Sequence, residues 1–495
     1  MAKALKALAI VLLLVGGRCF GQTIRLDSKN PHYFSFKGKP TLLITSAEHY
    51  GAVINKDFDY VQYLDALKAY GLNYTRIYPG ALFETVDKYM PGNPLGPKPR
   101  SLILPWARSD QPGYTLCGNK FDLDKWNPEY FARLRDFIAK AAERGIVVEI
   151  CLFNSQYSDT WPICPLNSEN NIQGVGKCNF VDAQTMRHPD LVARQDDYVR
   201  KLVQEANDFD NVILEICDEP ALFTPIPDAA PWVVHFVDVI KRAESTLPKQ
   251  HLIGQEVQGP PGGPIDLAGN PGVSVVITQY LYNSGDEEMG GLKGLDTEYS
   301  HNKAIEENET TWYPPDFSLI RPEFSYKGDK IADSRVEAWE FMVGGGASFN
   351  QLNGIFTPAD PGGKTADNAQ LLGALRNLKR FLESFDFISM QPDKKFVISG
   401  VPAGAHCRAI SEPGYQYAVY LHHSEGGNGG NYVATPGHYS ESLLLDLPQA
   451  TYKMDWIDPA TGSVIQSEIV THDEGPRAFT TPTYTVDIAL RIKRI

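Results

Sequence analysis

Two glutamates, each at the end of a strand-like run, are the residues with the clearest potential for chemistry. Glu219 ends the run that begins at Asn211, and Glu323 ends the run that begins at Leu319. Two carboxyl groups that face each other, one protonated and one ionised, are the minimum equipment for cleaving a glycosidic bond. The chain contains 60 acidic residues, so the pair gains its meaning only from its place at two predicted strand ends.

A buried cation is predicted beside this pair. Arg76 ends another strand-like run, and an opposite charge within a few ångströms lowers a carboxyl pKa by about 1–3 units. Such a neighbour would keep Glu323 ionised. Alternation along the strand of Glu219 places Glu215, Cys217 and Glu219 on one face. Glu149 and Glu215 lie in mid-strand, so we interpret them as partners of buried polar groups rather than as catalysts.

The elements that must position these residues alternate between strand and helix. Helices are predicted over residues 57–70, 128–144, 189–206, 232–245, 333–343 and 368–385. Repeated βα units of this number predict an α/β fold, a (β/α)8 TIM barrel, whose chemistry lies at the carboxyl ends of the strands. Residues 258–272 contain no obvious helix. The eight predicted strands are Thr41–Thr45, Leu72–Tyr78, Ile146–Phe153, Val212–Cys217, Leu252–Val257, Val273–Tyr282, Leu319–Phe324 and Ala347–Leu352.

The pattern changes near residue 395. From there to residue 495, short runs alternate apolar and polar residues between Pro/Gly turns, which predicts a small antiparallel β-sandwich. The predicted organisation is therefore a signal peptide at 1–21, a barrel at 22–388 and a β-sandwich domain at 395–495.

The first 21 residues have the pattern of an export signal. Lys3 and Lys6 precede an apolar run from Ala7 to Val15, and small residues precede Gln22. We therefore expect a secreted or periplasmic protein without a membrane contact after signal removal. The net charge is −14, and no basic stripe is present, which disfavours a nucleic-acid partner. The sequence says nothing of the oligomeric state.

The cysteines indicate neither a metal nor a cofactor. Cys151 and Cys217 lie in apolar runs, whereas Cys117, Cys164 and Cys178 lie in long predicted loops. Cys164 with Cys178 is the favoured disulfide, although the connectivity stays open. No CxxC or HxxxH spacing occurs, so no metal site is predicted.

Four segments, taken together, resemble one enzyme group. Gly71-Leu-Asn-Tyr-Thr-Arg76 is similar to the G-x-N-x-x-R segment of the clan A retaining glycoside hydrolases. Ile213–Pro220 resembles their fourth strand, Pro322–Ser325 their nucleophile strand, and Phe121–Asn127 a segment of their cellulase-like and apiosidase-like bacterial members. The resemblance covers residues 25–385, and the C-terminal part resembles the collagen-binding-type β-sandwich often appended to such proteins.

The resemblance implies a role for each matching residue. Glu219 would be the acid/base, Glu323 the nucleophile and Arg76 its partner. Tyr282 would hydrogen-bond the nucleophile, and Tyr280 would stand where the family often has His. The chain departs from the family at Asp218, where Asn usually contacts the sugar.

A second departure concerns the sugar platform. Many relatives have Trp on the eighth strand, whereas this chain has Phe349, Asn350 and Gln351. The predicted substrate-binding residues are Asp218, Asn154, His49, Tyr50, Trp161, Gln279, Phe349 and Asn350, with Tyr157 and Glu48 as further candidates.

The sequence therefore predicts a secreted retaining glycoside hydrolase that acts on an oligo- or polysaccharide without a cofactor. Two alternatives stay open: a non-catalytic carbohydrate-binding or scaffold protein on the same barrel, and a barrel hydrolase that uses a metal. Long loops after the second and third strands favour an exo-acting enzyme over an open cleft. The sugar and its linkage are not predicted.

Overall fold

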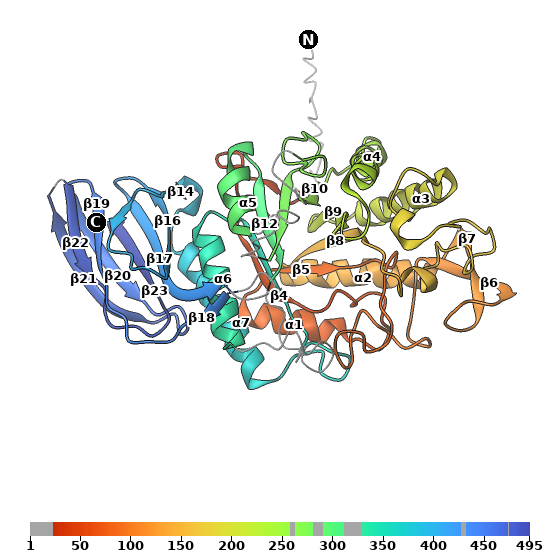
Figure 1. Cartoon of the computed structure of the whole chain (residues 1–495), viewed down its shortest axis with the longest axis horizontal. Helices are drawn as coiled ribbons and strands as arrows, with labels where there is room; N and C mark the ends of the chain where they lie inside the picture. The colour runs from red at the N-terminus through yellow and green to blue at the C-terminus, as the bar shows by residue number, and fades with distance from the viewer. Residues whose placement is uncertain (1–22, 258–262, 281–290, 311–327, 427–431, 474) are drawn as a thin grey trace, which may run out of the picture.

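The computed structural model describes residues 23–257, 263–280, 291–310, 328–426, 432–473 and 475–495. A parallel eight-stranded sheet surrounded by helices is followed by antiparallel sheets (Figure 1), which confirms the predicted barrel and the sandwich-like C-terminal region. The parallel sheet has the order β4-β13-β12-β11-β10-β9-β8-β5. Its strands are β4 (Leu43–Ala47), β5 (Tyr74–Ile77), β8 (Val147–Asn154), β9 (Val212–Asp218), β10 (Leu252–Glu256), β11 (Val275–Gln279), β12 (Ala304–Glu309) and β13 (Ser348–Leu352).

Asn73 joins the first and last strands of this order. Its backbone N–H donates to the carbonyl of Ile44 over 3.4 Å, and its side chain accepts from the Ile44 N–H at 3.2 Å. Its side-chain amide also donates to the carbonyl of Leu42 at 2.8 Å. The Asn of the G-x-N-x-x-R segment therefore helps close the barrel between β4 and β5.

The seventh strand is not where the sequence analysis placed it. β12 pairs with β11 on one side and directly with β13 on the other, so β12 is the seventh strand. Residues 319–324, which were predicted for this place, lie outside the described residues. The sequence analysis missed β12 because this strand reads Ala-Ile-Glu-Glu-Asn-Glu and lacks an apolar run. Its acidic side chains are buried with partners: Tyr74 donates to Glu306 at 2.5 Å, and Thr278 donates to Glu307 at 2.9 Å.

The helices follow the predicted ones closely, apart from α5, which the sequence analysis did not predict. α2 and α3 begin and end at the predicted residues. Asn127 caps the start of α2 by accepting from the N–H of Glu129, and Gly145 ends it in the left-handed region, with φ 75°. The helices are α1 (Tyr60–Tyr70), α2 (Pro128–Arg144), α3 (Pro189–Ala206), α4 (Ile226–Glu244), α5 (Gly291–Glu298), α6 (Lys330–Val343) and α7 (Ala366–Glu383).

Smaller strands lie before and between the barrel strands. A three-stranded sheet of β1 (Arg25–Leu26), β2 (Phe34–Phe36) and β3 (Lys39–Thr41) precedes the barrel. A hairpin of β6 (Trp106–Pro112) and β7 (Asn119–Trp126) lies within the segment that was predicted to be a long loop after the second barrel strand.

Two antiparallel sheets make up the C-terminal region, with a core shared between them. The first contains β14 (Gln391–Pro392), β16 (Ala405–Glu412), β17 (Gln416–Gly426), β23 (Asp487–Arg494), β20 (Ala450–Ile457) and β21 (Val464–His472), with β18 (Tyr432–Ala434) paired to β17. The second contains β15 (Val397–Ser399), β19 (Ser442–Leu447) and β22 (Gly475–Thr480).

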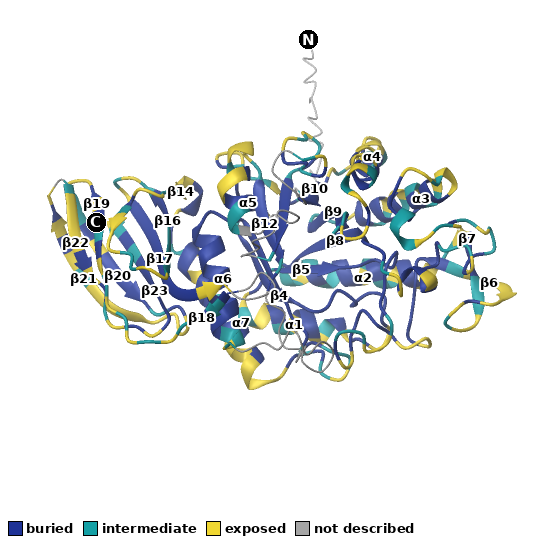
Figure 2. Ribbon diagram, in the orientation of Figure 1, coloured by how far each residue is buried: buried dark blue, intermediate teal, exposed yellow. Residues whose placement is uncertain are grey.

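Helix α6 lies between the barrel and the first C-terminal sheet and is buried over most of its length (Figure 2). Trp339 of α6 stacks on Tyr420 of β17 with ring centroids 5.4 Å apart. Arg335 donates two hydrogen bonds of 2.9 Å to Asp487 of β23. The barrel and the sheet therefore share this helix as part of one packed interior.

The predicted disulfide does not form. Cys164 and Cys178 are both free thiols, and the Cys164 thiol donates to the carbonyl of Ala81 at 3.2 Å. Within the described ranges, no helix combines the length and the apolar character needed to cross a membrane.

Candidate active site

A cavity of about 160 Å³ lies at the carboxyl ends of the barrel strands. In a (β/α)8 barrel this end carries the chemistry. Aromatic rings and carboxyl groups dominate its lining, which consists of His49, Tyr50, Tyr78, Leu82, Glu84, Tyr89, Leu95, Asn154, Tyr157, Asp218, Glu219, Tyr280 and Glu309.

Glu219 lies in this cavity, directly after the last residue of β9. Its backbone N–H donates to Glu256 of β10 at 2.5 Å, and Ser155 donates to its carbonyl. The hydroxyl of Tyr157 donates to its carboxylate at 2.9 Å. Glu219 therefore lies at the carboxyl end of the fourth strand, as predicted.

The second carboxyl group of the cavity is Glu309, which the sequence analysis missed. Glu309 ends β12, the seventh strand, and lies opposite Gln279 of β11 at a β-bulge. Gln279 and Tyr280 donate to its two oxygens at 3.5 and 3.4 Å. Glu323, the residue predicted for this place, lies outside the described residues, as does Tyr282. Glu309 stands at the end of the seventh strand, the place predicted for Glu323.

Arg76 has partners other than those predicted. Its guanidinium donates to both carboxylate oxygens of Glu215 at 2.7 and 2.6 Å and to Asp218 at 2.8 Å. Its Nε also lies 3.4 Å from an oxygen of Glu149. The expectation that Glu149 and Glu215 serve buried polar groups is thus confirmed, since both contact the buried guanidinium.

Asp218 accepts hydrogen bonds from four groups. Besides Arg76, these are the hydroxyl of Tyr78 at 2.5 Å, the side-chain amide of Gln279 at 2.6 Å, and the side-chain amide of Asn154. Asn in this position would have one acceptor oxygen and would place an amide beside the guanidinium. The Asp at position 218, where the resemblance implies Asn, therefore has a structural explanation: its carboxylate orients the side chains around the cavity.

Four residues that line the cavity have positive φ angles, which side-chain-bearing residues rarely adopt. One is Tyr89 (63°), in the segment after β5, and the other three follow strands of the barrel. These three are Tyr50 (56°), Glu219 (48°) and Tyr280 (54°). Such backbone costs about 1–3 kcal/mol per residue and persists where the surrounding structure enforces it. Glu219 follows the last residue of β9, and its carboxyl group lines the cavity from this turn rather than from the strand itself.

The charges around the cavity influence one another. Burial raises the pKa of Glu309 well above its ordinary value, and the negative charges of Asp218 and Glu219 raise it further. The positive charge of Arg76 acts in the opposite direction. Neighbouring carboxyls of this kind resist joint ionisation, which favours a state with one proton on the pair.

The remaining predicted binding residues divide into two groups. His49, Tyr50, Asn154 and Asp218 line the cavity. Trp161, Phe349 and Asn350 are buried and do not line it; the indole of Trp161 donates to the carbonyl of Cys178 at 2.8 Å.

Of these buried residues, Asn350 contacts a residue of the cavity wall, whereas Phe349 packs in the interior. Asn350 donates to Tyr50 at 3.3 Å and to the carbonyl of Asn308 at 2.8 Å, so it supports a wall residue. Phe349 packs against Phe341, with ring centroids 6.3 Å apart. Glu48, a further candidate, accepts from the N–H groups of Gly51 and Ala52 and holds the turn after β4.

One wall of the cavity comes from the segment after β5. The carboxylate of Glu84 there is 5% exposed and contacts His49 at 3.1 Å and Asn93 at 2.5 Å through the same oxygen. Lys88 of this segment pairs with Asp159 at 2.9 Å and lies 4.4 Å from the ring centre of Tyr157. These contacts join the segments that follow β5 and β8 and close one side of the cavity.

Comparison with known proteins agrees with this fold. No protein-family model matches the chain, and no curated protein is significantly similar to it. Among solved structures, a glycoside hydrolase has 14% sequence identity and a TM-score of 0.61, covering 96% of this chain and 97% of its own. A glycoside hydrolase family 5 protein from Bacteroides vulgatus has 14% identity and a TM-score of 0.59, covering 95% of this chain and 93% of its own. This similarity extends over the barrel and the C-terminal sheets together.

Proposed function

We propose that the protein is a retaining glycoside hydrolase in which Glu219 and Glu309 act as a pair. The observation that carries this proposal is that both carboxyl groups line one cavity, from the ends of β9 and β12. Structural similarity to glycoside hydrolases over nearly the whole chain supports it.

In the proposed reaction, Glu309 attacks the anomeric carbon and forms a covalent glycosyl-enzyme. Glu219 donates its proton to the leaving oxygen and then accepts a proton from the water that releases the sugar. The donors Gln279 and Tyr280 and the charge of Arg76 favour the ionised form of Glu309. The first step requires the one proton of this pair on Glu219, with Glu309 ionised.

The nucleophile assignment is tested by comparing Glu309→Ala with Glu323→Ala on activated aryl glycosides. We expect Glu309→Ala to lower turnover by about 1,000-fold or more, because no covalent intermediate can form without the carboxylate. Azide should restore part of this activity and release a glycosyl azide of inverted anomeric configuration. Glu323→Ala should keep most of its turnover.

The reverse result would contradict the assignment. Wild-type-like turnover in folded Glu309→Ala protein, with loss in Glu323→Ala, would return the role to Glu323. If neither variant nor the wild type cleaves any glycoside but the wild type binds sugars, the protein is a carbohydrate-binding protein on this barrel.

We further propose that the enzyme removes single sugars from chain ends. The cavity of about 160 Å³ is smaller than the roughly 300–1,000 Å³ that drug-sized ligands occupy, and Lys88 closes one side through Asp159 and Tyr157. A time course on a polysaccharide should release a monosaccharide from the start. Early release of mixed oligosaccharides would show endo action instead.

Export remains part of the proposal. It rests on the signal-like pattern of residues 1–21. N-terminal sequencing of the mature protein from its native cells should begin at Gln22, and a protein that retains Met1 would refute export by this signal.

A further inference from the structure

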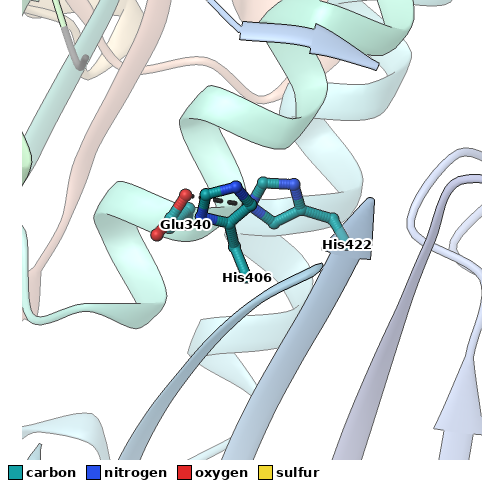
Figure 3. A group of neighbouring side chains, drawn as sticks. All are labelled: Glu340, His406 and His422. Atoms are coloured by element: carbon teal, nitrogen blue, oxygen red, sulfur yellow. Dashed lines mark hydrogen bonds and ion pairs between the residues drawn. The ribbon is translucent and has the colours of Figure 1, made fainter. Parts of the chain in front are cut away.

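Two histidines and a glutamate meet where the barrel contacts the C-terminal sheet, away from the cavity. Glu340 lies on α6, and His406 and His422 lie on the neighbouring strands β16 and β17. His406 and His422 are directly opposite each other in the antiparallel pair, so their side chains leave the same face. Figure 3 shows both imidazole rings next to the carboxyl group of Glu340. One ligand atom from each of the three residues lies within 4.8 Å of the other two.

One nitrogen of each imidazole ring contacts Ser424, so the other nitrogen is the one that can bind a metal. The Nε2–H of His406 donates to the carbonyl of Ser424 at 3.1 Å, so its Nδ1 carries the lone pair of the neutral ring. Nδ1 of His422 contacts the hydroxyl of the same Ser424 at 2.5 Å, and its Nε2 faces Glu340 at 2.9 Å. Histidines that bind metals are commonly oriented in this way, by a hydrogen bond from the nitrogen that is not the ligand.

The carboxylate of Glu340 needs a cation beside it because it is buried. Its two oxygens have different neighbours: Oε1 lies 3.3 Å from Nε of Arg408, and Oε2 faces His422. Arg408 has a second carboxylate partner, Asp296, at 3.1 Å. Arg408 is therefore shared between two acids, and Oε2 is the oxygen available to a cation placed between Glu340 and the imidazoles.

We propose that Glu340, His406 and His422 bind one divalent transition-metal ion of the zinc type. Two imidazole nitrogens and one carboxylate oxygen form a donor set that zinc uses in proteins. The hydroxyl of Tyr432, 3.3 Å from Nδ1 of His406, is a further oxygen beside this set. The ion takes the place of the proton between Glu340 and His422 and links α6 of the barrel to the C-terminal sheet.

The sequence could not indicate this site, because the three ligands come from three elements and are separated by 66 and 16 positions along the chain. The inference does not depend on the proposed glycosidase activity, because none of the three residues lines the cavity and their partners lie on β16, β17 and β18.

Titration of metal-free, untagged full-length protein with Zn²⁺ and Co²⁺ tests the site. We expect one equivalent of Zn²⁺ by calorimetry, release of protons on binding, and visible absorption bands of bound Co²⁺ with imidazole ligands. Zn²⁺ should also raise the melting temperature. The variant of choice is His406→Ala, because His406 is partly exposed while Glu340 and His422 are buried. It should bind at least about 100-fold more weakly.

His235→Ala is the matched control. His235 also contacts a carboxylate, Asp196 at 2.6 Å, but it lies on α4 of the barrel and, among the residues that the structure describes, belongs to no such three-residue group. Its loss should change neither the affinity nor the cobalt spectrum. The proposal is overturned if the wild type binds no Zn²⁺ at micromolar concentrations, or if His406→Ala binds as tightly as the wild type.

Discussion

At the scale of single residues, Asp218 controls the charge balance of the cavity. It and Glu215 share the buried guanidinium of Arg76, and Asp218 also accepts from Tyr78, Asn154 and Gln279. The four donor residues of Asp218 all come from other barrel strands or the turns after them. The charge of Asp218 therefore acts on Glu309 of the proposed pair while its oxygens fix the surrounding side chains.

This charge predicts a pH effect. Burial and the charges of Asp218 and Glu219 raise the pKa of Glu309, and activity in our proposal requires ionised Glu309. The acidic limb of the pH profile should therefore lie above the ordinary range of Glu. Asp218→Asn removes one negative charge, so the pKa of Glu309 falls and the acidic limb moves to lower pH. The measurement is kcat/KM against pH on an aryl glycoside, and an acidic limb that stays in place or moves upward would refute this coupling.

The acid role of Glu219 has its own signature. Glu219→Gln cannot donate a proton, so natural substrates should be cleaved about 100–10,000-fold more slowly, within the usual contribution of general acid catalysis. Aryl glycosides with acidic leaving groups need no proton and should be affected least in the first step. Equal losses on both kinds of substrate would show that Glu219 is not the acid.

Sequence reasoning found one member of the proposed catalytic pair and missed the other for a physical reason. Glu219 follows an apolar strand, Val212–Asp218, whose pattern is easy to interpret. Glu309 ends a strand, β12, in which Tyr74 and Thr278 donate to the buried carboxyl groups of Glu306 and Glu307. Those donors are distant in the chain, so the segment has a polar composition and does not resemble a barrel strand.

At the scale of elements, the bounds of α2 could be predicted from the sequence, whereas the role of α6 could not. α2 begins after Asn127 and ends before Gly145, and both signals are local in the sequence. α6 has buried charged residues, among them Asp333, Arg335, Glu337 and Glu340, whose partners lie in the C-terminal sheet. Its role as a shared element depends on contacts that no local pattern records.

One of these contacts makes a testable contribution to stability. Arg335 and Asp487 form a buried bidentate pair, to which Tyr420 also donates at 2.9 Å. Asp487→Ala leaves the guanidinium buried without its carboxylate, and breaking such a pair costs about 3–5 kcal/mol. The double variant Arg335→Met, Asp487→Leu leaves no unpaired charge and should lose less. Urea denaturation of the three proteins measures this, and a double variant less stable than Asp487→Ala would contradict the argument.

At the scale of the whole molecule, the barrel and the C-terminal sheets are connected by more than α6. Asn377 of α7 donates to the carbonyl of Ala460 at 2.9 Å, in the turn between β20 and β21. Gln416 of β17 donates to the carbonyl of Asp386 at 3.0 Å, just after α7. The predicted boundary between residues 388 and 395 therefore divides the chain but does not separate two independent packing units.

This connection predicts that the barrel depends on the sheets that follow it. A chain that ends at residue 389 would expose Trp339, which stacks on Tyr420 in the full chain. It would also leave Arg335 and Glu340 without their partners Asp487 and His422. Burying a large aromatic side chain and pairing a buried charge each contribute a few kcal/mol, comparable with much of the roughly 5–15 kcal/mol by which a protein is stable. We therefore expect the truncated chain to aggregate or to melt well below the full-length protein, and the full-length protein to unfold in one calorimetric transition. Size-exclusion chromatography and scanning calorimetry measure both. A monomeric truncated barrel with an unchanged melting temperature, or two separate transitions in the full chain, would show that the two parts are independent.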